Sequence, residues 1–305
     1  MKLIGSLDLP AHFAPGGFDH AAFHAGTARL YVAHTSNSAI DVINCAADRF
    51  LFSIHNLTGV AGALLSEEHG LVFTSNRGED TIGIFAVGDE NNIAKVKVGI
   101  HPNGLSFDPG RGLLLAANVG DPMIPNSHTL SVVDVERREM IHSIPVPGRT
   151  RWTIFDSAAG CFYVNIADPF QIVVIDSAYP TRISRSMEIP ANGPHGLDFD
   201  PATNRLFCAC DAGKLFALDA SSGRILLEAD LSGAPDVIFF NPTRKHLYVA
   251  VGNPGVIDLF ETDSLKRIET ISTENGAHTI GFDAVRNKVY AFLPMAHRAA
   301  VYLDA

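Results

Sequence analysis

PHGLDFDP, at residues 194–201, is a stretch that recurs along the whole chain with a period of forty-odd residues. Clear copies are PNGLSFDP (102–109), TRWTIFDS (150–157), PDVIFFNP (235–242) and AHTIGFDA (277–284), and weaker copies are FDHAAFHA (18–25) and VAGALLSE (60–67). Aligned on their equivalent positions, the copies are separated by 42, 42, 48, 44, 41 and 42 residues. Seven copies at this period are typical of a closed repeat architecture.

Each copy opens a run of four short apolar segments. In the third repeat these are NGLSF (103–107), GLLLAAN (112–118), TLSVVDV (129–135) and EMIHSIPV (139–146). Short segments rich in Val, Ile, Leu and Phe, bounded by Gly, Pro, Asn and Asp, indicate antiparallel strands joined by tight turns. Four strands per repeat predict a propeller blade, and the seven repeats predict an all-β, seven-bladed β-propeller.

The two ends of the chain predict how the ring closes. The last repeat has three segments, and KLIGSLDLP (2–10) resembles the blade-ending segments MIHSIPVPG and SRSMEIPANG. We therefore expect one domain over residues 1–305, in which the strand at 2–9 completes the seventh blade. The interval from His278 around this closure to Asp19 is 46 residues, in line with the others, and closure would remove an exposed sheet edge.

The composition restricts the class of partner. The net charge is −10 and no basic run occurs, which argues against a nucleic acid or an anionic membrane surface. No segment is long and apolar enough to span a membrane, and Asp8 interrupts the apolar stretch that a secretion signal would need. We expect a cytoplasmic protein that acts on a small molecule, with four reduced, buried cysteines; its oligomeric state stays open.

In a propeller the first strand of each blade lines the central channel, so the residues aligned at the second motif position should ring one mouth. They are Asp19, Ala61, Asn103, Arg151, His195, Asp236 and His278. His195, Asp236, His278 and Asp19 lie on successive blades and form a ligand set expected for zinc, manganese or iron(II), with calcium or magnesium as alternatives. A wet channel would also collect polar side chains without a metal, and Asp19 could give way to His20.

The remaining residues at this mouth predict a site for an anion. Arg151 could hold a carboxylate or phosphate in a bidentate pair, or could instead pair with Asp236 or Asp19 across the channel. Trp152 offers a ring on which a substrate could stack. Asn103 could orient the substrate or a metal-bound water, and His20 could act as a general base because its unperturbed pKa lies near neutrality.

Loops on the same face supply further polar groups. His34 and His297 are expected to contact the substrate. The longest loop, NVGDPMIPNSHT (118–129), is either a lid over the mouth or an ordinary surface loop, since loops longer than a hairpin needs are often functional.

The blade pattern resembles the YVTN-repeat β-propellers over nearly the whole chain. LYVAHTSNSAIDVIN (30–44), LVFTSNRGEDTIGIF (71–85) and LYVAVGNPGVIDLFETDS (247–264) carry the resemblance. More distantly the chain is similar to the gluconolactonase and paraoxonase propellers, which implies calcium and lactone hydrolysis, and to virginiamycin B lyase, which implies magnesium and an axial His. Asn103 and Asp236 match the lactonase set by position, whereas His195 and His278 do not belong to it.

Two functions follow from these patterns. The first is a metal-dependent hydrolase or lyase that acts on a small anionic molecule at the top of the channel. The second is a scaffold whose rim binds a protein or a small ligand without chemistry, because propellers of the same fold perform both roles.

Overall fold

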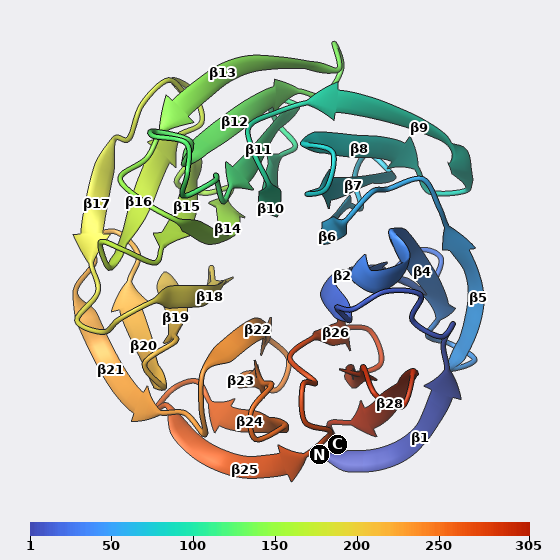
Figure 1. The fold of residues 1–305 in the computed structure, drawn as a ribbon. Coiled ribbons are helices and arrows are strands. Elements are labelled where there is room, and N and C mark those ends of the chain that lie inside the picture. The colour runs from blue at the N-terminus through green and yellow to red at the C-terminus, as the bar shows by residue number, and fades with distance from the viewer.

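The computed structural model describes residues 1–305 as a ring of seven four-stranded antiparallel sheets around a central channel (Figure 1). The predicted fold class is confirmed. Each blade runs from its first strand at the channel to its fourth strand at the rim. Apart from the strands the chain has one helical turn, η1 (Thr35–Asn37), and thus no helix with the length and apolarity that a membrane crossing requires.

The first three blades follow the chain in order. Their strands are β2 (Phe18–His24), β3 (Arg29–His34), β4 (Ala39–Asn44) and β5 (Arg49–Ile54); β6 (Val60–Ser66), β7 (Leu71–Asn76), β8 (Thr81–Ala86) and β9 (Asp89–Lys97); and β10 (Pro102–Asp108), β11 (Leu113–Asn118), β12 (Thr129–Asp134) and β13 (Glu139–Pro145).

The next three blades repeat this order. Their strands are β14 (Thr150–Asp156), β15 (Cys161–Ile166), β16 (Gln171–Asp176) and β17 (Arg185–Glu188); β18 (Pro194–Asp200), β19 (Arg205–Cys210), β20 (Lys214–Asp219) and β21 (Ile225–Asp230); and β22 (Pro235–Asn241), β23 (His246–Val251), β24 (Val256–Glu261) and β25 (Lys266–Ser272).

The seventh blade joins the two ends of the chain. It consists of β26 (Ile280–Asp283), β27 (Lys288–Leu293), β28 (Arg298–Leu303) and, at the rim, β1 (Lys2–Asp8). β1 pairs antiparallel with β28 from Lys2 opposite Leu303 to Asp8 opposite Arg298, and Nε of Arg298 donates to Oδ1 of Asp8 at 2.7 Å. The N-terminal strand therefore closes the ring, as the sequence predicted.

The hydrophobic core is divided among the blade interfaces. Seven clusters of buried side chains occur, and each combines residues of two neighbouring blades. Tyr31, Tyr163, Tyr248 and Tyr290 are among the largest fully buried side chains, and all four lie on second strands. The four cysteines are unpaired and buried, as predicted.

Glycines on the first strands let neighbouring blades approach each other closely at the channel. A Cβ at Gly104 would lie 2.6 Å from the carbonyl oxygen of Arg151, and one at Gly196 would lie 2.6 Å from that of Asp236. Real Cβ atoms do not come so close, so a larger residue would push the blades apart. The motif glycine thus positions the backbone of the residues at the channel mouth.

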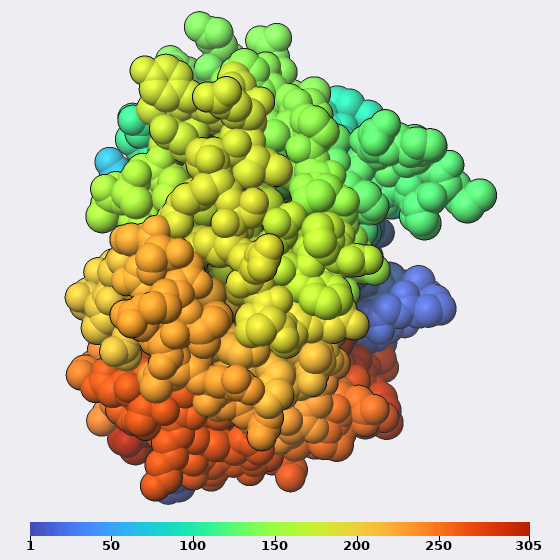
Figure 2. All heavy atoms as spheres, turned by 90° about the vertical axis from the view of Figure 1, so that its left-hand side faces the viewer, coloured from blue at the N-terminus to red at the C-terminus, as the bar shows by residue number.

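The longest loop of the chain projects from one face of the ring. In Figure 2 it is the green segment that stands out beyond the disc, on the same side as a blue N-terminal segment. Hydrogen bonds inside the loop join Asp121 to Ser127 at 2.8 Å, and the side chain of Met123 is 84% exposed. A lid function for this loop stays a prediction.

Candidate functional site

The second residue of each motif copy lies at one end of the channel, which we call the upper mouth. Six of the seven first strands shift register against their second strand at the start of the motif. A β-bulge of this kind bends the strand and changes the direction in which a side chain points. Side-chain directions at the upper mouth therefore depart from simple alternation.

His195 is held by two carboxylates. Its Nδ1 lies 2.7 Å from Oδ1 of Asp211, and its Nε2 lies 3.2 Å from Oδ1 of Asp236. Burial alone would favour the neutral ring, but the charge of Asp236 and the hydrogen bonds to Asp211 and Asp236 outweigh burial and raise the pKa of His195 to about 9. His195 is therefore an imidazolium that donates from both nitrogens at neutral pH.

Asp236 lies between two histidines. Its Oδ2 is 3.8 Å from Nε2 of His278, on the side away from His195. Although burial opposes ionisation, the charge and hydrogen bond of His195 hold the pKa of Asp236 well below its usual range. Nδ1 of His278 lies 2.8 Å from the carbonyl oxygen of Gly276, which can only accept a hydrogen bond, so in the neutral ring the lone pair is on Nε2.

Arg151 adds a guanidinium to the same group. Its Nη2 donates to Oδ2 of Asp211 at 3.2 Å, and its Nη1 lies 3.2 Å from Nε2 of His195. Because His195 is charged, two donors face each other across that second distance. The alternative considered for Arg151, an ion pair with Asp236 or Asp19, is not formed: its ion-pair partner is the loop residue Asp211.

Two more arginines reach the upper mouth from loops. Nη2 of Arg77 lies 3.8 Å from Oδ2 of Asp19. Burial, with Arg151 and Arg77 nearby, lowers the pKa of Arg149, although a guanidinium stays charged in proteins. Nε of Arg77 and Nε of Arg151 are buried without an acceptor among the protein's own atoms. Two guanidinium N–H groups at the mouth therefore have no acceptor, and the buried Oδ1 of Asn103 has no donor.

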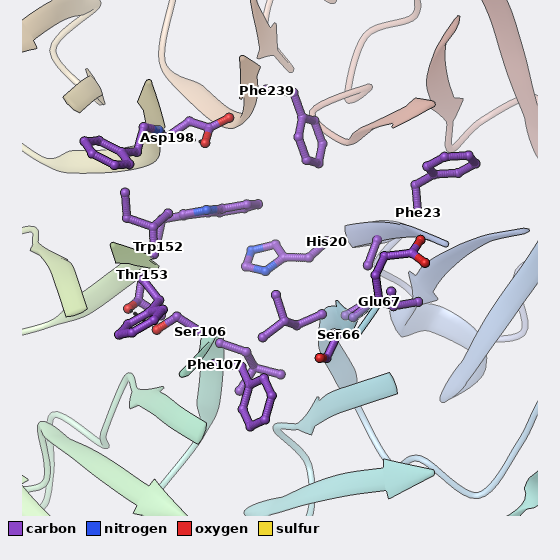
Figure 3. A pocket seen from close by; sticks show the side chains of 18 of the residues that line it. His20, Phe23, Ser66, Glu67, Ser106, Phe107, Trp152, Thr153, Asp198 and Phe239 are labelled. Carbon is purple, nitrogen blue, oxygen red and sulfur yellow. Dashed lines mark hydrogen bonds between the residues drawn. The ribbon is translucent and has the colours of Figure 1, made fainter. Parts of the chain in front are cut away.

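His20 and Trp152 divide the channel. Their rings meet at 3.9 Å between centroids, and Figure 3 shows them pointing toward each other near the axis. His20 is buried, and burial lowers its pKa while it raises that of Asp19, whose Oδ1 lies 3.3 Å from Nε2 of His20. Trp152 thus stacks on a side chain of the protein itself.

The predicted substrate contacts His34 and His297 lie in a separate cluster. Both rings pack against His12, at 4.8 and 4.5 Å between centroids. His34 is fully buried, and its Nδ1 lies 2.7 Å from Oδ2 of Asp41. Asn103 is also buried, and its Oδ1 has no partner. Of these three, only Asn103 belongs to the ring of first-strand residues.

Several residues around the channel were not singled out from the sequence. Arg77 and Arg149 come from loops that the repeat alignment does not cover, and Asp211 was one of many polar loop residues. Asp198 lies on the first strand β18 and lines the cavity drawn in Figure 3. Its acidic character, at a motif position that carries no other charged residue, is a signal that could have identified it.

The predicted metal ligands can be compared with the charges around them. His195 offers no lone pair while both its nitrogens donate to carboxylates, and Arg151 lies beside it. No group of three or more His, Cys, Asp and Glu side chains is arranged to hold a metal ion. These side chains do not fit a divalent ion in their present arrangement, so metal binding stays a prediction that metal analysis of the purified protein would test.

The charge of His195 can be measured directly. We expect its pKa to be about 9 and to fall by about one to two units in Asp211→Asn, because a charge-assisted hydrogen bond is lost. Long-range ¹H–¹⁵N NMR of the histidine rings would follow the titration, with His195→Gln to assign the signal. An unperturbed pKa near 6.5 in the unmodified protein would contradict this arrangement.

Comparison with known proteins adds support for the fold. No protein-family model matches the chain, so membership of the YVTN-repeat family stays a prediction. The protein YncE of Salmonella typhimurium is 24% identical over 196 residues, covering 63% of this chain and 54% of the relative. The match thus spans about half the length of that relative.

Two solved structures superimpose on nearly the whole chain. A chain of Kuenenia stuttgartiensis hydrazine synthase has a TM-score of 0.82 at 14% identity, with 97% of both chains covered. A chain of the mitotic checkpoint complex has a TM-score of 0.82 at 11% identity, with 99% of this chain and 92% of the other covered. At such low identity the similarity concerns the propeller fold alone.

Proposed function

We propose that the upper mouth binds a small anionic molecule and acts on it by acid–base catalysis. The single observation that carries the proposal is the pair of donors at 3.2 Å, Nη1 of Arg151 and Nε2 of the charged His195. Two cations at this distance repel each other, and further negative charge would stabilise the pair beyond what Asp211 and Asp236 already contribute. A carboxylate or phosphate would supply that charge.

The balance of charge around the mouth supports the same ligand class. Arg77, Arg149, Arg151 and His195 are positive, whereas Asp211 and Asp236 are negative, and burial raises the pKa of Asp19. Arginine forms bidentate pairs with planar carboxylates and with phosphates. The cluster of cationic side chains and the unpaired N–H groups of Arg77 and Arg151 favour an anion over a metal cation.

His278 and His195 would act as base and acid. The lone pair on Nε2 of His278 could take a proton from the bound molecule, and Nε2–H of His195 could give one to a leaving group. Both nitrogens lie next to the carboxylate of Asp236, which couples the two rings. A base and an acid on opposite sides of one carboxylate suit an elimination or a hydrolysis.

Binding of the anion can be tested without knowing the substrate. We expect succinate, a dianion above about pH 6, to bind at about pH 7 and to lose about tenfold in affinity by about pH 10, where His195 is neutral. Isothermal titration calorimetry with the unmodified protein would measure this. Failure of succinate and of inorganic phosphate to bind at any pH would contradict the proposal, and so would a stoichiometric transition metal at the site.

The scaffold alternative differs in what His278 does. If the mouth only binds its ligand, no reaction takes place in any variant. His278→Gln then changes only the affinity for that ligand. If the mouth catalyses, the same variant abolishes turnover of an anionic substrate found by screening hydroxy and amino acids, while succinate still binds. The glutamine retains a hydrogen-bonding group but cannot take up a proton.

A further inference from the structure

The lower half of the channel contains a cavity whose lining includes none of the charged residues of the upper mouth. Its volume is about 630 Å³, and 14 of its 24 lining residues are hydrophobic. The lining comes from the first strands of six blades, and the His20–Trp152 pair lies at its inner end (Figure 3). This volume falls in the range of pockets that enclose small organic molecules.

Aromatic rings line the cavity on several sides. Phe23, Phe107 and Phe239 are seen around the opening in Figure 3, and Phe155 and Phe199 complete the set. Aromatic faces attract organic cations through the ring quadrupole, and they also bury apolar surface. Such a wall suits a ligand with an apolar body.

One carboxylate projects into this apolar space. Asp198 accepts hydrogen bonds from the backbone N–H of Phe199 at 2.8 Å and of Phe240 at 2.6 Å, and it forms no ion pair. The bond to Phe240 joins two blades, but a neutral amide oxygen would serve that purpose equally well. A carboxylate without a counter-ion beside aromatic rings indicates that a cation belongs there.

All the other formal charges along the cavity have the same sign. The lining includes Glu67 and Glu68, at the end of the cavity nearer solvent, and it includes no Lys or Arg. His20 is buried next to Trp152, and burial lowers its pKa, so it adds no positive charge at neutral pH. Anionic ligands are therefore disfavoured at this end of the channel, in contrast to the upper mouth.

We propose that the lower cavity binds a small organic cation with an aryl or alkyl body, whose ammonium group pairs with Asp198. The apolar body would occupy the space between the phenylalanines. This proposal does not rest on the proposed acid–base chemistry, because the cavity lining includes none of Arg151, His195 and His278 and the two ligands have opposite charge.

Fluorescence provides a local readout, because Trp152 is the single tryptophan of the chain and lines the cavity. Titrations would use 2-phenylethylammonium, its neutral counterpart 2-phenylethanol and the anion 3-phenylpropanoate. We expect the cation to bind about tenfold more tightly than the alcohol, and the anion to bind most weakly. Equal binding of all three probes, or no binding of the cation, would overturn the proposal.

Asp198→Asn should reduce the affinity for the cation to that for the alcohol, while binding of the alcohol stays unchanged. The exposed Asp89→Asn removes the same charge from the protein away from the cavity, and it should leave all three affinities unaltered. Circular dichroism and thermal unfolding would show that both variants fold. Succinate binding at the upper mouth would be measured in parallel, so that failure of one site is distinguished from failure of the other.

A second test needs no variant. Benzyltrimethylammonium keeps its charge at every pH, so any pH dependence of its binding comes from the protein. Burial raises the pKa of Asp198 to about 6, and the carboxylate is thus protonated below this pH. We expect the affinity to fall about tenfold between about pH 8 and about pH 5. A constant affinity over this range would contradict the pairing with Asp198.

Discussion

Replacing Arg151 by Met is expected to weaken succinate binding at the upper mouth by about 100-fold, because a bidentate charge-assisted pair contributes about 3 kcal/mol. Nη2 of Arg151 donates to Asp211 and Nη1 faces His195, at 3.2 Å in each case, while Asp211 and His195 also contact each other directly at 2.7 Å. Met keeps the unbranched stem and its packing but removes the charge. Isothermal titration calorimetry at about pH 7 would measure the loss.

Two further variants make this result specific. Arg151→Lys keeps the charge but not the planar fork, and we expect an intermediate affinity because a point charge cannot form both bonds. Arg137→Met removes the same charge from an exposed turn and should change the affinity by less than about twofold, since exposed charges are screened by salt. If Arg137→Met weakened binding as much as Arg151→Met, net charge rather than the site would explain the effect.

Deletion of residues 1–9 is expected to abolish folding of the monomer under conditions in which the full chain is stable. The deletion removes the β1–β28 pairing and the buried side chains of Leu7 and Leu9, each of which contributes about 1.5–3 kcal/mol. Lost ladder hydrogen bonds add about 1 kcal/mol each. The sum is comparable to the whole stability of a protein, about 5–15 kcal/mol. Urea denaturation followed by circular dichroism would measure the change.

Addition of the missing strand in trans provides the control. A peptide with the sequence of residues 1–10 should restore a folded signal and suppress association through the exposed edge of β28. The same peptide with Leu7→Asp should fail, because a carboxylate cannot occupy the cluster between the seventh and first blades. Normal stability of the truncated chain would show that the six remaining blades and the three-stranded seventh hold the ring without closure.

The fold was predictable because the same sequence motif, one for each blade, occurs seven times in the chain. Seven copies of one motif give the blade count even though the copies at 18–25 and 60–67 are weak, and the closing strand follows from a missing segment at one end. The second motif residues reach one mouth because six of the seven first strands start at the first motif residue, and His278 lies just before the shorter β26. Residues at the same position of the repeated motif therefore occupy equivalent places around the channel.

The site was less predictable, for three physical reasons. Arg77 and Asp211 directly follow the second strands β7 and β19, outside the first-strand motif on which the prediction was aligned. The bulge at the start of the first strands changes side-chain directions, which is why the meeting of His20 with Trp152 was not foreseen. Finally, an imidazole and a carboxylate compose a metal site or an ion pair equally well, and only the distances around His195 distinguish the two.

The contact between His20 and Trp152 gives the channel an unusual property. Arg151 and Trp152 are consecutive residues of β14, one beside the upper mouth and the other beside the lower cavity. A ligand that moves Arg151 must therefore act on the same short piece of backbone that carries Trp152. If the two compartments bind as proposed, thermodynamic linkage makes any effect of one occupant on the other reciprocal. The ring would then be a receptor with two sites, in which binding of an acid at one site changes the affinity of the other site for an amine.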